Sequence, residues 1–199
     1  MPRLEKNLII DRCPHCSLAH PNLFKKSDEV TKDHAGQIER HWFFYSCGGC
    51  GGIVIAWAFG SGQEIIEIFP EPQKVDEDIP ERPRAFLEQA IASIHAPAGA
   101  IMLAASAVDS MLKIKGYKDS TLNERIVQAA DDHLITKEMA SWAHEVRLDA
   151  NDQRHADDNA LLPTGDDAKR AIEFTKALAE FLFVLPAKVQ RGMEQASNK

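Results

Sequence analysis

Cys13-Pro14-His15-Cys16 and Cys47-Gly48-Gly49-Cys50 decide how the first third of this chain folds. The two stretches hold all four cysteines of the 199 residues, arranged as two C-x-x-C pairs. Each pair has the spacing of a tight turn, and four thiolates are the ligand set of a closed structural zinc site. The sequence therefore predicts one structural Zn²⁺ per chain, bound by Cys13, Cys16, Cys47 and Cys50.

The same cysteines could instead form two redox pairs or remain as four buried thiols. A redox C-x-x-C pair normally opens a helix in a βαβ unit, and no such pattern surrounds these pairs. A catalytic zinc needs an open position for water, whereas four thiolates complete the tetrahedron. His15 and His41 are spare nitrogen ligands nearby, with no vacancy to fill. We therefore expect the metal to be structural.

Short runs rich in aromatic and β-branched residues surround the cysteines. Residues 7–11 lead into the first pair and residues 41–45 into the second, and two further runs, 53–59 and 64–69, are joined through Gly60-Ser61-Gly62. Such runs favour strands, and a strand that enters a C-x-x-C turn is typical of a zinc ribbon. Residues 1–69 are predicted to form a small β zinc ribbon.

The composition of the rest of the chain indicates a linker followed by a helical region. Residues 70–83, PEPQKVDEDIPERP, contain four prolines and five acidic residues, which predicts a linker without regular structure. From Arg84 onward apolar residues recur at helical spacing, and we expect helices over about 84–96, 98–115, from Thr121, from about Thr136, and over about 166–185. Residues 151–165 are expected to be looped, and Pro186 to end or kink the last helix.

The predicted fold class is therefore α+β: a β zinc ribbon followed by an all-α bundle of about five helices in 84–199.

The charge and hydropathy of the chain exclude some classes of function. The formal net charge is −7, and no segment is basic, which disfavours tight nonspecific binding to duplex nucleic acid. The longest apolar run, 96–108, is shorter than a membrane span, and the N-terminus lacks the apolar region of a signal peptide. We expect a soluble, cytoplasmic protein with no membrane partner.

A second group of polar residues follows the apolar stripe of the fourth predicted helix. Arg147, Asn151 and His155 are spaced i, i+4 and i+8. An arginine can stabilise charge on a phosphate, a histidine can transfer protons near neutral pH, and an asparagine can orient either group. In one straight helix Arg147 and His155 would be about 12 Å apart. They could converge if the helix breaks near Ala150, or across a two-fold dimer interface.

The helical part of the chain resembles the domain-of-unknown-function 4145 family. The residues that carry the resemblance are the Ala-rich run 104–112, the run from Leu134 to Ala140, and Trp142, Arg147, Asn151 and His155. Together they fit an Arg-x-x-Gly-Asn-x-x-x-His signature, with Ala150 in the place of the glycine. This family is placed near the HEPN (higher eukaryotes and prokaryotes nucleotide-binding) helical domains, which include metal-independent ribonucleases of defence and RNA processing.

The resemblance implies a HEPN-like bundle in which Arg147 and His155 are the phosphate-stabilising and acid–base pair, with Asn151 in support. Two functions stay open. The first is a zinc-binding, dimeric interaction module linked to nucleic-acid processing or phage defence, with RNA or protein as partner. The alternative is a metal-independent HEPN-type endoribonuclease that uses Arg147 and His155, so the sequence leaves open whether the protein is an enzyme.

Overall fold

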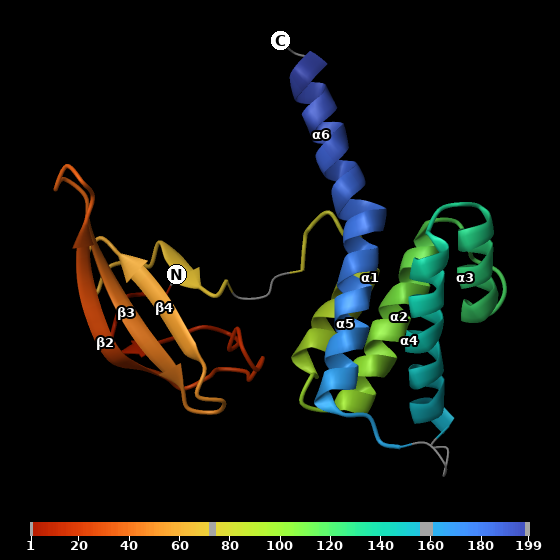
Figure 1. Ribbon diagram of the computed structural model, residues 1–199, viewed down its shortest axis with the longest axis horizontal. Coiled ribbons are helices and arrows are strands. Elements are labelled where there is room, and N and C mark those ends of the chain that lie inside the picture. The colour runs from red at the N-terminus through yellow and green to blue at the C-terminus, as the bar shows by residue number, and fades with distance from the viewer. Residues whose placement is uncertain (1, 72–74, 156–160, 198–199) are drawn as a thin grey trace. The chain divides into compact units, whose positions relative to one another are not determined.

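A computed structural model describes residues 2–71, 75–155 and 161–197, and Figure 1 shows its helices and strands. The chain divides into two compact units, Met1–Lys74 and Val75–Lys199. We call them the β unit and the helical unit. The predicted α+β class is confirmed, because antiparallel strands come first and helices follow.

The β unit is a five-stranded antiparallel sheet in which each strand pairs with the next along the chain. Its strands are β1 (Asn7–Leu8), β2 (Leu23–Lys32), β3 (Glu39–Cys47), β4 (Ile53–Ala58) and β5 (Glu67–Phe69). Alternate residues of β3 and β4 point to one face and form a small core with the N-terminal segment, in which Tyr45, Val54 and Leu4 are fully buried. The two cysteine turns lie at the ends of these elements, so the sheet positions the thiols.

Strand β2 was not predicted from the sequence. Its residues, LFKKSDEVTK, are mostly charged or polar and mostly exposed, so the usual apolar alternation is missing. The strand forms because its backbone pairs with β3 from Leu23 to Lys32, with a bulge between Lys25 and Ser27. Backbone pairing with an aromatic neighbour strand has overridden weak local propensity.

The helical unit is built around α2, which packs against α1, α3, α4 and α5. Its elements are α1 (Glu81–Ala92), α2 (Pro97–Ile114), α3 (Leu122–Asp131), α4 (Lys137–His155), α5 (Gly165–Ala179), a π-helical turn (Glu180–Val184) and α6 (Leu185–Ser197). Figure 1 shows α5 and α6 as nearly one continuous rod. The core is dominated by α2, whose Ile101, Val108 and Met111 are almost completely buried.

Two predicted boundaries were wrong. Helix α1 begins at Glu81, inside the predicted linker, because Pro83 lies in the first turn, where a backbone N–H has no intrahelical acceptor. Helix α4 continues to His155, so residues 151–155 are helical and not looped. A break near Ala150, one of the two ways in which Arg147 and His155 could converge, is absent from this described stretch, as suits alanine in the place of a glycine.

Helix α6 was also missed. Pro186 was expected to end or kink the last helix, and the π-helical turn just before it re-phases the backbone so that the helix continues from Leu185 to Ser197. No residue of α6 is buried.

By length and composition alone, α2 is apolar enough to cross a membrane. Half of it is buried inside the helical unit, however, which is the behaviour of a core helix.

Candidate functional site

The four cysteines of the β unit form one cluster. Their sulfur atoms all lie within 4.8 Å of one another, and the Sγ atoms of Cys13 and Cys50 are 3.9 Å apart. A tetrahedral zinc with Zn–S bonds of about 2.3 Å separates its sulfurs by about 3.8 Å. The four thiols therefore fit a tetrahedral metal ion with only a small contraction.

The turns around the sulfurs are built for this geometry. The backbone N–H groups of Gly49 and Gly52 donate to the Sγ atoms of Cys47 and Cys50, each at 3.4 Å. Gly51 has φ +73°, a left-handed conformation that favours glycine. A Cβ on Gly52 would lie 2.5 Å from the His15 ring, so this close approach also requires glycine. Glycines in the second turn thus donate backbone hydrogen bonds to the sulfurs and allow the backbone to turn tightly.

The two nearby histidines are engaged elsewhere. His15 Nε2 lies 2.7 Å from the carbonyl oxygen of Ile53, and His41 Nε2 lies 3.0 Å from Glu39 Oε1. Neither imidazole is needed to complete the ligand set. The donor set is therefore four thiols, which suits a soft or borderline cation.

The thiols differ in acidity. Burial raises the pKa of Cys16 to about 12, and burial also raises the pKa of Cys13. Burial opposes ionisation of Cys47 as well, but hydrogen bonds from the backbone of Cys50 and Gly49 outweigh it and lower the pKa to about 7. Because a metal binds thiolates, its binding here must displace protons from Cys13 and Cys16.

A second candidate site is a groove in the helical unit. It has a volume of about 1480 Å³ and lies along α2, α3 and α4, with Arg82 and Phe86 of α1 at its edge. Its cationic lining residues are Arg82, Lys113, Lys118, Arg125, Arg147 and Arg154. Asp109 is the one carboxylate among the described lining residues, and the remaining polar ones include Ser106, Thr121 and Asn151. The groove is thus strongly cationic, although the whole chain carries −7.

Arg125 and Asp109 hold the wall of the groove together. Arg125 of α3 is buried, and its Nη1 donates to Asp109 Oδ1 of α2 at 2.5 Å, while Nη2 donates to the Lys118 carbonyl at 3.1 Å. Lys113 also pairs with Asp109. The Asp109 carboxylate is therefore already shared by two cations and does not neutralise the α4 arginines.

The α4 face of the groove is formed by Arg147, Ala150, Asn151 and Arg154, at i, i+3, i+4 and i+7. The Arg147 side chain is half-buried, and its Nε has no hydrogen-bond partner among the residues that the structure describes. The neighbouring His144 has a lowered pKa because of burial and the Arg147 charge, so it is neutral at pH 7. Asp109 is the one carboxylate in the described lining, and its ion pairs are with Lys113 and Arg125, so the Arg147 charge is left for a ligand.

The predicted trio is only partly assembled in the described structure. Arg147 and Asn151 both line the groove. His155 is the last residue of α4, and its side chain lies outside the described part of the chain. Because the helix is continuous, His155 lies eight positions after Arg147, about 12 Å along the axis. Within one chain, α4 therefore does not bend to bring them together, and the catalytic role of the trio stays a prediction.

Three arginines of the groove were missed by sequence reasoning. Arg154 could have been found, because it is seven residues after Arg147 and lies on the same face of a continuous helix. Arg82 and Arg125 come from α1 and α3, and only the tertiary packing brings them beside α4. A sequence pattern on one helix carries no signal for such a convergence.

Comparison with known proteins gives one match. The model of a domain of unknown function, DUF4145, matches residues 88–196, which is more than half of the chain and includes α2 to α5 and nearly all of α6. No curated protein and no solved structure matches the chain. The matched region contains most of the groove but neither cysteine pair. On the sequence of its helical unit, this chain belongs to the DUF4145 family.

Proposed function

We propose that the protein is a nucleic-acid interaction module whose helical unit binds phosphates in the cationic groove. The observation that carries this proposal is the composition of the groove, with six cationic side chains and one carboxylate on a chain of net charge −7. Guanidinium groups bind phosphate oxygens through paired hydrogen bonds, and Arg147 and Arg154 line the same face of α4. We place the module in nucleic-acid processing or defence.

The size of the groove supports a polymeric ligand. Small-molecule sites are typically about 300–1,000 Å³ and mostly apolar, whereas this groove is larger, open and lined by charge. The lining cations not paired with Asp109 come from α1, from the loop between α2 and α3 and from α4, so they are spread along the groove instead of meeting at one point; they are Arg82, Lys118, Arg147 and Arg154. Such a spread suits successive phosphates of a strand.

The β unit supplies the second half of the proposal. We propose that its metal is Zn²⁺ and that the unit is a zinc ribbon, because four thiolates in a closed set favour zinc in a structural role. Elemental analysis of purified protein should give about one zinc per chain. Much less than one equivalent of zinc, or a stoichiometric amount of another metal, would contradict this assignment.

A metal-independent endoribonuclease is the second candidate, because Arg147 and Asn151 of the predicted trio both line the groove. In this proposal Arg147 would stabilise charge on the scissile phosphate and His155 would transfer the proton. The straight α4 requires His155 to come from a second copy, so this candidate needs a homodimer. It predicts RNA cleavage in the presence of EDTA during a short incubation, and this cleavage should be lost in His155→Ala.

The binding proposal is tested with a fluorescently labelled single-stranded RNA and the full chain. The double variant Arg147→Ala/Arg154→Ala should weaken binding at least tenfold at low salt, because two phosphate contacts are removed. The matched control is Lys169→Ala/Arg170→Ala on α5, which removes the same charge outside the groove. Equal affinity of the groove variant and the wild type, or equal losses in both variants, would contradict the groove as the binding site.

A further inference from the structure

The β sheet has a second face that its core does not use. The core face carries Phe43, Tyr45, Val54 and Ala56, which are buried. The alternate residues form the opposite face, which we call the aromatic face; its members are Trp42 and Phe44 of β3, Ile55 and Trp57 of β4, and Phe69 of β5. Cross-strand pairing places Trp42 opposite Trp57, Phe44 opposite Ile55, and Ile55 opposite Phe69. These side chains therefore lie on one face of the sheet, in adjacent register positions.

A sheet face directed to solvent is normally polar, so this composition requires an explanation. The ring centroids of Trp42 lie 5.7 Å from those of Trp57 and 6.4 Å from those of Phe69. Phe69 is 42% exposed, and Phe59, which packs edge-on against Trp57, is 54% exposed. A contiguous set of partly exposed rings on a sheet is typical of a binding surface.

Both indoles are fixed in place by their own hydrogen bonds. The Trp42 Nε1–H donates to Thr31 Oγ1 at 2.8 Å, and the Trp57 Nε1–H donates to Glu67 Oε2 at 2.9 Å. The polar edge of each ring is thus satisfied within the β unit. Trp57 is only 8% exposed and supports its neighbours, so the π face offered to a ligand is that of the partly exposed Trp42. Its fixed orientation lowers the entropy cost of stacking.

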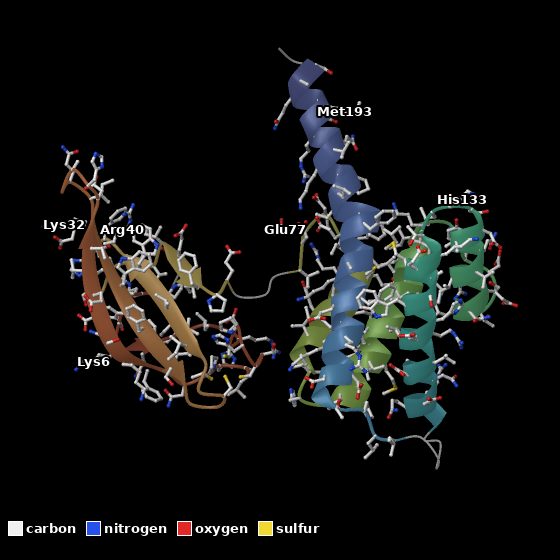
Figure 2. The ribbon with its side chains drawn as sticks, in the orientation of Figure 1. Lys6, Lys32, Arg40, Glu77, His133 and Met193 are labelled. Carbon is white, nitrogen blue, oxygen red and sulfur yellow. The ribbon has the colours of Figure 1, made fainter. Side chains whose placement is uncertain are left out.

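The charges around the rings indicate what the ligand is. The Arg40 guanidinium, labelled in Figure 2, lies 5.2 Å from the centroid of Trp57, and Lys26 Nζ lies 4.1 Å from the centroid of Phe24. Arg40 lies at one end of the row of rings, two residues before Trp42 on β3. At the other end, beyond Phe44, Phe24 pairs with Ser46 and carries Lys26 over its ring. A cation therefore lies at each end of the row. On the same face Glu67 is engaged by Trp57, and Glu29 lies opposite Trp42. Cations at both ends suit a phosphate on either side of stacked bases, while the carboxylates keep the electrostatic part of the affinity small.

We propose that the aromatic face binds single-stranded nucleic acid by stacking bases on Trp42, Phe44 and Phe69. Trp42 and Phe44 are two residues apart on one strand, about 7 Å, so that neighbouring unpaired bases each contact a ring. Stacking of this kind tolerates any base sequence, because every base has a π face. This site is on the β unit and does not depend on the groove. It differs from the groove in mechanism, because its main contacts are to the bases, whereas those of the groove are to phosphates.

The test titrates the full chain at high salt with a ten-nucleotide oligouridine and with an abasic oligonucleotide of the same length. High salt screens contacts to phosphates, so binding that survives reports stacking. The oligouridine is expected to quench tryptophan fluorescence and the abasic strand is not. Equal binding of the two strands, or no binding of oligouridine to the wild type, would overturn the proposal.

Two substitutions separate stacking from simple hydrophobic contact. Trp42→Leu keeps an apolar side chain but loses the ring, and it should weaken oligouridine binding about 5- to 100-fold. Trp42→Phe keeps a ring and should bind within about threefold of the wild type. Phe69→Leu, at the exposed end of the sheet, is the second loss-of-ring variant if Trp42→Leu has a reduced metal content. Wild-type affinity in the folded loss-of-ring variants would overturn the aromatic face as a base-binding site and favour a protein partner that needs only apolar area.

The groove variants distinguish this proposal from the proposed function. Arg147→Ala/Arg154→Ala should leave high-salt oligouridine binding unchanged while weakening low-salt binding. If that double variant abolishes binding at both salt concentrations while the ring variants change nothing, the groove proposal survives and this one fails.

Discussion

Arg125 shows how one residue joins two elements of the helical unit. Its guanidinium lies between the Asp109 carboxylate of α2 and the carbonyl of Lys118 just before α3, and it is buried. A buried cation of this kind is stable only with its partners, because removing one leaves an uncompensated charge or carbonyl. The pair therefore fixes the wall of the groove, and the α4 arginines are left to meet a ligand.

We predict that Arg125→Ala lowers the free energy of unfolding by about 2–3 kcal/mol. The loss is below that of a fully buried pair because Asp109 keeps Lys113 as a partner and is 23% exposed. Urea denaturation measures this loss of free energy of unfolding. An unchanged m-value would show that the variant changed stability and not the compactness of the native or denatured state. The double variant Asp109→Asn/Arg125→Met should recover part of the loss. A cost below about 0.5 kcal/mol for Arg125→Ala would mean that this pair does not hold α3 to α2.

At the scale of elements, local chemistry predicted the start of α3 and the metal ligands but not the end of α4. The helix expected from Thr121 does begin there, because Thr121 and Glu124 form a capping box whose two hydrogen bonds join residues three positions apart. The four cysteines were assigned as one site from their spacing, and their sulfurs do cluster. The end of α4 was placed too early, since Asn151 and Asp152 are common helix-ending residues, yet the helix continues through them to His155. Local signals thus found the start of α3 and the metal ligands, whereas the continuation of α4 and α6 through Asn151 and Pro186 was missed.

The candidate sites also could be predicted only where their residues share one stretch of sequence. Arg147 and Asn151 were found because they share one helix, and Arg82 and Arg125 were not, because the fold alone brings α1 and α3 to the groove. Helix α6 was missed for a related reason: Pro186 is a local stop signal, and the π-helical turn before it cannot be read from apolar periodicity.

Helix α6 is tethered by an ion pair that should make it sensitive to acid. Arg191 donates to both carboxylate oxygens of Asp78, at 2.7 and 2.8 Å, and the hydrogen bond holds the pKa of Asp78 below its ordinary value of 3.8. A carboxyl group with a lowered pKa stabilises the fold above its ordinary pKa, and this contribution disappears as pH falls through the lowered value. The tether is therefore complete at neutral pH and is lost in strong acid.

We predict that Asp78→Asn speeds amide hydrogen exchange in α6 at neutral pH while leaving α2 unchanged. The variant removes the carboxylate but keeps the size of the side chain, so only the tether is lost. Exchange measured by mass spectrometry on peptides from α6 and α2 checks this. Identical exchange of α6 in variant and wild type would show that the ion pair adds nothing to the helix.

At the scale of the whole molecule, the two units should depend on metal differently. The β unit has a small core, so the metal centre should supply much of its stability, whereas the helical unit has its own larger core. Metal removal should therefore unfold the first 74 residues and leave the helices folded.

Chelation of the metal is predicted to collapse the NMR signals of β2 to β4 and to leave those of α2 and α5 in place. Cys47→Ser should have the same effect without chelator. Because Cys13 and Cys16 have raised pKa values, protons compete with the metal, and metal should be released more readily as pH falls. A β sheet that stays folded after metal removal would contradict this account of the two units. So would helices that unfold together with the sheet when the metal is removed.

The central claim is that the arginines of α4 contact phosphates in the groove. The most direct measurement is the slope of log affinity against log salt concentration for a single-stranded RNA, taken for the wild type and for Arg147→Ala/Arg154→Ala. Each phosphate contact contributes about −0.7 to this slope, so the double variant should be less steep by about 1.4. The same slope in both proteins would show that these arginines do not bind phosphates and would contradict the account.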